Sequence, residues 1–133
     1  MWLSCKHVLA SMLKAGGGSL VLAGSPTGLN GAAGFTAYAS SKAGSYALCR
    51  TIAADYARDR IRCNVLVPGP MNTPLTKDLF ADKTFHDGIV RGTMMGRIGE
   101  AHEIVPLLVF LASDESSYCT GGYYMADGGM TAL

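Results

Sequence analysis

The sequence predicts an α/β fold in which three parallel strands with flanking helices form a partial doubly wound sheet. Three observations predict it. Short apolar segments alternate with helical patterns, these segments end at Gly- or Pro-rich turns, and 133 residues suffice for one domain. This alternation builds a parallel sheet with right-handed crossovers. Three strands make only half of a doubly wound sheet, so the first half of such a fold is not contained in these residues.

The first helix and the first strand are predicted from apolar spacing. Apolar residues recur at helical intervals over residues 2–15, and three consecutive glycines end that pattern. The continuous apolar run at 20–23 is typical of a parallel strand that is covered on both faces. Residues 24–36 hold several glycines and a proline, which favours a loop at the carboxyl end of this strand.

A long helix and a second strand follow. Residues 37–58 contain no proline and only Gly44 as a helix breaker, so we expect one continuous helix. Apolar residues then alternate and merge into a continuous run over 61–67, which predicts a strand. The sequence Pro68-Gly69-Pro70 stops it.

The last third of the chain has a less regular pattern. Residues 74–99 are expected to have mixed secondary structure, with a short helix near 75–81 and a mobile Gly-rich part. A third helix is predicted over 101–112, with at most a kink at Pro106. A short strand at 123–126 precedes Asp-Gly-Gly, which we interpret as a structural turn. Ligands in such folds lie beyond the carboxyl ends of the strands, so the loops before and after the long helix and second strand, 24–36 and 68–99, are expected to share one cleft.

Composition excludes several classes of protein. With 49% hydrophobic and 16% charged residues, the chain is not a disordered tail. Its net charge of +1 comes from scattered residues, which disfavours nucleic-acid and membrane partners and favours a small neutral ligand or another protein. The four cysteines fit no zinc or redox spacing, so reduced thiols, no metal and a cytoplasmic location are expected.

Candidate chemistry gathers at the start of the long helix. Tyr38 and Lys42 are one turn apart and share a face, which places an ammonium near a phenol. A nearby cation favours the phenolate and suits the tyrosine to acid-base work. Ser25 follows the first strand, where its hydroxyl can bind a substrate oxygen. Taken alone, this Tyr-Lys spacing is more often a surface tyrosine beside a solvated lysine, with Ser25 as a turn residue.

The pair is one of five ordered motifs, and with them the chain resembles the short-chain dehydrogenase/reductase family. They are GGGSLVLAGS ending at Ser25, YASSK from Tyr38 to Lys42, IRCNVLVPGPMNT ending at Thr73, FLASD ending at Asp114, and TG followed by DGG near the carboxyl end. The resemblance covers essentially the whole chain. It implies a Rossmann-like domain of which residues 1–133 are the carboxyl-terminal half.

The resemblance also implies a role for each matching residue. Tyr38 would be the general acid-base, Lys42 would bind the nicotinamide ribose and favour ionisation of the tyrosine, and Ser25 would position the substrate carbonyl. The segment after the second strand would contact the nicotinamide side of NAD or NADP through Pro68, Gly69, Met71 and Thr73. A turn in which Thr73 caps the next helix is the alternative.

The implied function is hydride transfer between NAD(P) and a ketone or secondary alcohol. The Gly-rich turn that holds the cofactor pyrophosphate in this family is not found here, so this chain alone is expected to be inactive. The alternative is a non-catalytic partner of full-length relatives. A homo-oligomer through the helices at 2–15 and 37–58 is also implied. The apolar residues Phe80, Phe85, Met94 and Met95 fall in the segment that the family uses as a substrate lid, although packing explains them equally well.

Overall fold

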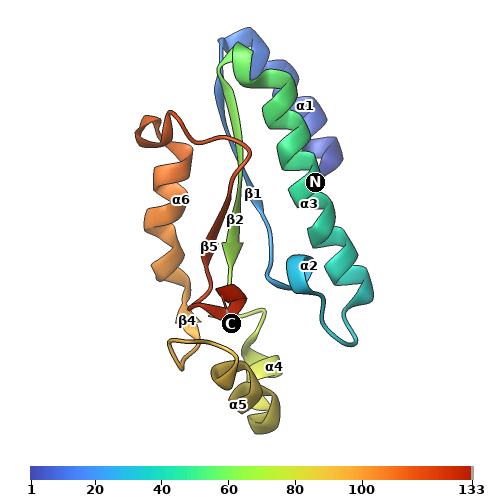
Figure 1. The fold of residues 1–133 in the computed structure, drawn as a ribbon, viewed down its shortest axis with the longest axis vertical. Coiled ribbons are helices and arrows are strands. Elements are labelled where there is room, and N and C mark those ends of the chain that lie inside the picture. The colour runs from blue at the N-terminus through green and yellow to red at the C-terminus, as the bar shows by residue number, and fades with distance from the viewer. Residues whose placement is uncertain (133) are drawn as a thin grey trace.

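The computed structural model describes residues 1–132 and shows a three-stranded parallel sheet with helices on both faces (Figure 1). The strand order is β1 (Gly18–Ala23), β2 (Ile61–Pro68) and β5 (Tyr123–Ala126). Both strand pairs are parallel, with Leu20 opposite Cys63 and Val65 opposite Tyr123. The predicted strands, their order and their direction are confirmed.

The helices form two layers around this sheet. Helices α1 (Trp2–Ala15) and α3 (Thr36–Tyr56) lie on one face, and α6 (Val105–Ala112) lies on the other (Figure 1). Helix α1 ends where predicted, because Gly16 adopts the left-handed conformation and its N–H bonds to the last turn. Helix α3 passes through one 3₁₀ turn and stops at Arg60, also left-handed.

The core lies between β2 and the α1–α3 layer. Strand β2 is the central strand and is buried along most of its length. Cys49 and Ile52 of α3 pack on it, joined by Cys5 and Leu9 of α1. Within residues 1–132, strand β1 pairs with one strand, β2, and Leu22 is its one buried residue. In this part of the chain the sheet therefore ends at β1, with backbone groups that no strand pairs.

Arg62 fixes helix α6 to the opposite face of the sheet. Its guanidinium donates to the carbonyl oxygens of Leu111 (3.2 Å) and Ser113 (2.8 Å) at the end of the helix and to the Ser116 hydroxyl (2.7 Å). A cation here also interacts favourably with the negative end of the helix dipole.

The prediction of a plain loop over 24–36 is wrong in part. A short helix, α2 (Thr27–Asn30), forms there because Pro26 already has helical angles, and its carbonyl accepts from the N–H groups of Leu29 and Asn30. Helix α2 packs directly on α3: a Cβ on Gly28 would lie 2.8 Å from the backbone carbonyl carbon of Lys42. Only glycine permits this approach beside a predicted site residue.

Residues 74–99 are more regular than predicted. Besides α4 (Lys77–Ala81), a second helix, α5 (Lys83–Arg91), occupies the part expected to be mobile. It begins because the Asp82 carboxylate accepts from the Phe85 N–H at 2.9 Å. Two short strands, β3 (Met71–Asn72) and β4 (Gly99–Glu100), pair in parallel and close this segment at its base.

The helix predicted over 101–112 is divided. Residues Ala101–Ile104 form a 3₁₀ turn, and α6 begins at Val105 with Pro106 in its first turn. Proline has no N–H to donate, so it is accommodated where no helical bond is required. The proline starts the α-helix instead of bending it. Among residues 1–132, no helix combines the length and the apolar character that a membrane crossing requires.

Candidate active site

Tyr38 and Lys42 meet at the first turns of α3, as their spacing predicts. The Lys42 ammonium lies 5.7 Å from the centre of the Tyr38 ring and donates to the carbonyl oxygen of Ala23 at 3.1 Å. This bond ties the lysine to the carboxyl end of β1. The Tyr38 side chain is 45% exposed and packs edge-on against Phe35. In residues 1–132 its hydroxyl has no hydrogen-bond partner, so it can serve a ligand.

Ser25 lies two residues beyond β1 and is buried. Its Oγ accepts from the Thr27 N–H at 3.3 Å, which leaves its own hydroxyl proton available to donate. Lys42 and Ser25 are therefore brought to the same strand end. No hydrogen bond joins Ser25 to Tyr38 in the part of the chain that the structure describes.

Tyr46 holds Ser25 in place and was not predicted. Its hydroxyl accepts from the Ser25 N–H (3.0 Å) and donates to the Ser25 carbonyl oxygen (2.6 Å). Burial raises the pKa of Tyr46, so the phenol stays neutral and keeps its proton for this bond. Its ring lies 4.6 Å from that of Tyr123. A signal was present in the sequence, because positions 38, 42 and 46 continue one face of the helix.

We expect Tyr46→Phe to destabilise the fold by about 1–3 kcal/mol, because it leaves the buried N–H and carbonyl of Ser25 without their partner. The urea midpoint measures this change. Tyr123→Phe is the matched control. It removes one hydrogen bond, to the Tyr46 carbonyl, and should cost about 0.5–1.5 kcal/mol. An equal effect of the two variants would show that Tyr46 does not support Ser25 in this way.

The Pro68-Gly69 turn lies directly against the carboxyl-terminal turn. A Cβ on Gly69 would lie 2.5 Å from the Cα of Asp127, so no other residue fits without displacing backbone. The Gly69 N–H also donates to the Ala126 carbonyl at 3.0 Å. Contacts within the chain thus already require this glycine. Its approach to a cofactor stays a prediction.

Thr73 and Met71 take part in a turn that follows β3. The Thr73 hydroxyl lies 3.0 Å from that of Thr76 and accepts weakly from the Thr76 N–H at 3.3 Å. Thr76 in turn donates to the Met71 carbonyl at 2.6 Å. Thr73 therefore stabilises the turn before α4 instead of capping the helix directly. The cofactor contacts expected of both residues stay predictions.

Asp127 is structural, in line with its interpretation as a turn residue. Its carboxylate accepts from the N–H of Gly129 (2.9 Å) and from the N–H (2.9 Å) and hydroxyl (2.6 Å) of Thr131. Burial opposes its ionisation, but these hydrogen bonds outweigh burial and lower the pKa of Asp127. The carboxylate thereby fixes the tail of the chain against Gly69.

This pKa shift predicts an acid-labile tail. A carboxyl group whose folded-state pKa is depressed adds stability above the ordinary Asp value, about 3.9, and loses it as the pH falls through the lower folded-state value. The amide NMR signals of Gly129 and Thr131 should therefore move only below about pH 4. Asp127→Asn should abolish that titration. Midpoints near neutral pH would contradict the assignment.

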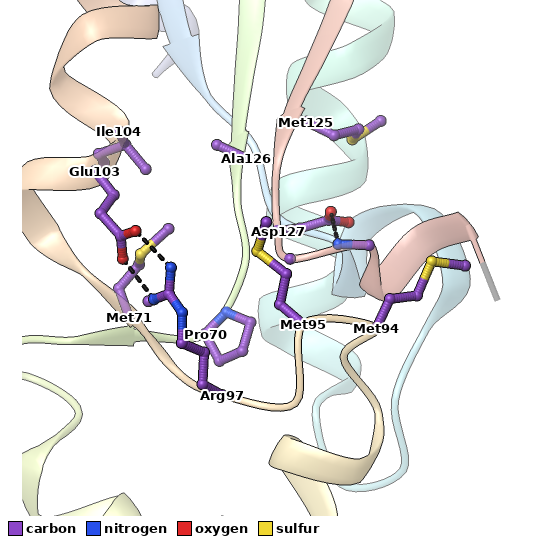
Figure 2. Close-up of a pocket in the computed structure, with 13 residues that line it drawn as sticks. Pro70, Met71, Met94, Met95, Arg97, Glu103, Ile104, Met125, Ala126 and Asp127 are labelled. Carbon is purple, nitrogen blue, oxygen red and sulfur yellow. Dashed lines mark hydrogen bonds and ion pairs between the residues drawn. The ribbon is translucent and has the colours of Figure 1, made fainter.

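A pocket of about 470 Å³ adjoins this turn (Figure 2). Four methionines contribute to its wall, and Arg97 and Glu103 form an ion pair on one side. The remaining lining residues are Pro70, Gly99, Ile104, Ala126, Asp127, Gly128 and Gly129. No residue of 24–36 lines it, and neither Tyr38 nor Lys42 does. The expected single cleft between the loops at 24–36 and 68–99 is therefore not this pocket.

The parallel α/β sheet has Ser25 and Lys42 at the end of β1, with Tyr38 beside the lysine, which is the arrangement that the resemblance to short-chain dehydrogenase/reductases implies. Comparison with known proteins supports the family. The family described as Enoyl-(Acyl carrier protein) reductase matches residues 1–131. The chain belongs to the short-chain dehydrogenase/reductase family.

Individual relatives differ in the reactions that their names describe. The chain is 40% identical over 131 residues to a 3-oxoacyl-[acyl-carrier-protein] reductase from Homo sapiens, covering 98% of this chain and 52% of the relative. It is 37% identical to a 2-keto-3-deoxy-L-fuconate dehydrogenase from Xanthomonas campestris, covering 97% of this chain and 45% of the relative. The chain thus spans about half the length of these relatives.

Solved structures match with the same coverage. A gluconate 5-dehydrogenase from Burkholderia cenocepacia, in complex with NADP and tartrate, superposes with a TM-score of 0.93 at 30% identity, over 97% of this chain and 51% of that one. A putative NAD(P)-dependent gluconate 5-dehydrogenase from Beutenbergia cavernae, with bound NADP, superposes with a TM-score of 0.95 at 32% identity. This match covers 99% of this chain and 53% of that one. Both matched structures hold NADP.

Proposed function

We propose that these residues supply the catalytic half of an NAD(P)-dependent oxidoreductase that interconverts a ketone and a secondary alcohol. The observation that carries the proposal is the Tyr38–Lys42 pair at the carboxyl end of β1, with the lysine bonded to Ala23 and Ser25 two residues further on. Family membership supports the reaction class. The cofactor is NAD or NADP, and the substrate is a small carbonyl or alcohol.

The donor groups of this site fit a nicotinamide riboside. An ammonium has three N–H donors, and Lys42 uses one of them on the Ala23 carbonyl. The others can bind ribose hydroxyls. Among residues 1–132, the Tyr38 hydroxyl is unpaired and its side chain is partly exposed. A bound nicotinamide would supply or accept the hydride.

Each site residue then has one task in carbonyl reduction. Tyr38 donates the proton that the carbonyl oxygen needs when its carbon receives a hydride, so the product is a neutral alcohol. The Ser25 hydroxyl donates a hydrogen bond to that oxygen and orients the substrate. The Lys42 charge stabilises the phenolate left on Tyr38. In alcohol oxidation the same groups act in reverse.

A completed domain tests the proposal. We would join residues 1–133 to the amino-terminal half of the human relative and follow the oxidation of NADH and NADPH with a panel of ketones. Turnover of at least one ketone is expected. A folded completed domain that binds cofactor and reduces none of the ketones would overturn the proposal.

A cytoplasmic location is also proposed, and it is supported by the four free cysteines.

We also propose that α1 and α3 pair with a second copy. Trp2 and Leu3 of α1 are 60% and 63% exposed, and Ala43 and Ala47 of α3 are exposed and small enough for close helix approach. Sedimentation velocity of the completed domain should show a dimer or a larger assembly.

Ala43→Arg should shift that assembly toward monomer, because a charged side chain blocks close approach of the helices. Tyr118→Arg is the control, since Tyr118 is fully exposed and belongs to neither helix. A stable monomer at micromolar concentration would contradict the proposed interface. A non-catalytic role as a partner of full-length relatives would use the same exposed helices.

A further inference from the structure

Helix α2 contacts both Ser25 and the first turns of α3. Two amides at the start of α2 bond to the serine: the Thr27 N–H donates to the Ser25 Oγ at 3.3 Å, and the Gly28 N–H donates to the Ser25 carbonyl oxygen at 2.9 Å. The position of Ser25 therefore depends on the position of α2.

Gly28 is a point at which α2 touches the helix that carries Lys42 (Figure 1). A Cβ on Gly28 would lie 2.8 Å from the Lys42 carbonyl carbon and 2.9 Å from both the Ala43 nitrogen and the Lys42 Cβ. These atoms belong to the backbone or to the first carbon of a side chain, so none of them can rotate away. Only the hydrogen of a glycine fits in this contact, which thereby sets how closely α2 approaches α3.

These contacts form a closed ring at the end of β1. The Lys42 ammonium donates to the Ala23 carbonyl oxygen at 3.1 Å, and Ser25 follows Ala23 by two positions. From Ser25 the ring passes through Gly28 of α2 to Lys42 and back to β1. Alanine has the same backbone N–H as glycine, so Gly28→Ala changes the spacing in the ring without removing a hydrogen-bonding group.

We infer that Gly28 is a positioning residue that sets the spacing between the Ser25 hydroxyl and the Lys42 ammonium. This inference rests on the proposed function, in which Ser25 orients the substrate carbonyl and Lys42 binds the cofactor ribose. Hydride transfer requires the carbonyl carbon to lie close to the nicotinamide, and a misplacement of about 1 Å can lower the rate on the order of 100-fold. The spacing between the two binding groups therefore controls the rate and not the affinity for either ligand.

Crystal structures of the completed domain test the spacing without turnover. Gly28→Ala is expected to lengthen the distance between the Cα atoms of Ser25 and Lys42, because the new Cβ pushes α2 and α3 apart. Gly44→Ala is the matched control and should leave this distance unchanged. Gly44 lies on α3 two residues after Lys42, and over residues 1–132 a Cβ there would meet no atom outside its own helix within 4 Å. An unchanged distance in Gly28→Ala would overturn the inference.

Nuclear Overhauser effects in the unsubstituted domain give a measurement that does not depend on the folding of a variant. The Gly28 Hα atoms should show these effects to the Lys42 Hβ atoms, both with and without bound NADPH. Their absence would mean that α2 does not touch this turn of α3 in solution, and it would also overturn the inference.

Turnover per bound cofactor separates positioning from a loss of folded enzyme. Gly28→Ala should lower kcat per cofactor-binding site at least about tenfold and change the KM values for cofactor and ketone by less than about threefold. Gly44→Ala should change neither. A purely structural role of Gly28 would reduce the number of cofactor-binding sites and leave kcat per site unchanged, which would contradict the inference.

A double-mutant cycle with Ser25→Ala identifies the partner through which Gly28 acts. When the Ser25 hydroxyl is absent, Gly28→Ala should lower kcat little further, because the group whose position it changes is already gone. Additive losses would overturn the inference. A completed domain that binds NADPH and reduces no ketone would overturn the proposed function instead, and the crystal structures would still decide the spacing.

Discussion

Tyr38→Phe in the completed domain is expected to lower kcat at least about 100-fold, the usual contribution of a general acid-base group. The variant keeps the ring that packs against Phe35 and removes only the hydroxyl, which has no partner among residues 1–132. Its fold should therefore be unaffected. Cofactor affinity should change little, because Lys42 keeps its bond to the end of β1.

Matched variants separate this effect from a structural one. Tyr118→Phe makes the same chemical change at a fully exposed tyrosine and should leave kcat unchanged. Lys42→Ala should lower kcat as well, but should also weaken cofactor binding, because a donor and a charge are lost together. Wild-type turnover by Tyr38→Phe would exclude Tyr38 as the proton donor.

The second large effect concerns residues 1–133 by themselves. We expect them to bind neither NADH nor NADPH at micromolar concentration and to show no oxidoreductase activity. The helix that follows β1 directly, α2, has four residues, too few to offer a pyrophosphate the N-terminal amides and dipole of a full helix. Only the nicotinamide end of the cofactor would find partners.

Uncovered surface adds to this expectation. Over the described residues 1–132, one edge of β1 pairs with no strand, and apolar residues of α1 are exposed. At about 25 cal/mol per Å², a few hundred Å² of uncovered apolar surface costs several kcal/mol, comparable to the roughly 5–15 kcal/mol of a whole domain. Fluorescence titration of the chain alone and of the completed domain measures the difference. Micromolar binding by a soluble, cooperatively folding chain alone would contradict the expectation.

The strands and long helices could be predicted from the sequence because burial determines their pattern. Strand β2 is buried along most of its length, and its apolar residues alternate before they merge into a continuous run over 65–67. Helix α5 was missed because its neighbourhood is rich in glycine, although Asp82 three residues before Phe85 was a capping signal. Pro106 was expected to bend a helix over 101–112 at most, whereas the structure has it in the first turn of α6.

The candidate site was predictable only in part. Tyr38 and Lys42 could be paired because both lie on one helix, where spacing determines proximity. The support of Ser25 by Tyr46 joins residues 21 positions apart through tertiary packing. Helical spacing places Tyr46 on the same face as Tyr38 and Lys42, but it does not report the bonds to Ser25. The methionine pocket was missed for the same reason, since its wall comes from separate segments that only the folded sheet brings together.

The position of β2 between β1 and β5 also constrains the order of events during synthesis. Gly18 of β1 pairs with Ile61 of β2, whereas Val65 of β2 pairs with Tyr123 of β5. Strand β5, the second neighbour of the central strand, is therefore translated after both other strands of this sheet. Domains fold as the chain leaves the ribosome, and pairings between residues far apart in sequence form slowly. Until Tyr123–Ala126 emerges, the nascent chain exposes one edge of β2, the strand that is buried along most of its length in the fold. Emergence of Tyr123–Ala126 is therefore the step that covers this edge of β2, and it limits how long the strand is open to chaperones and to aggregation.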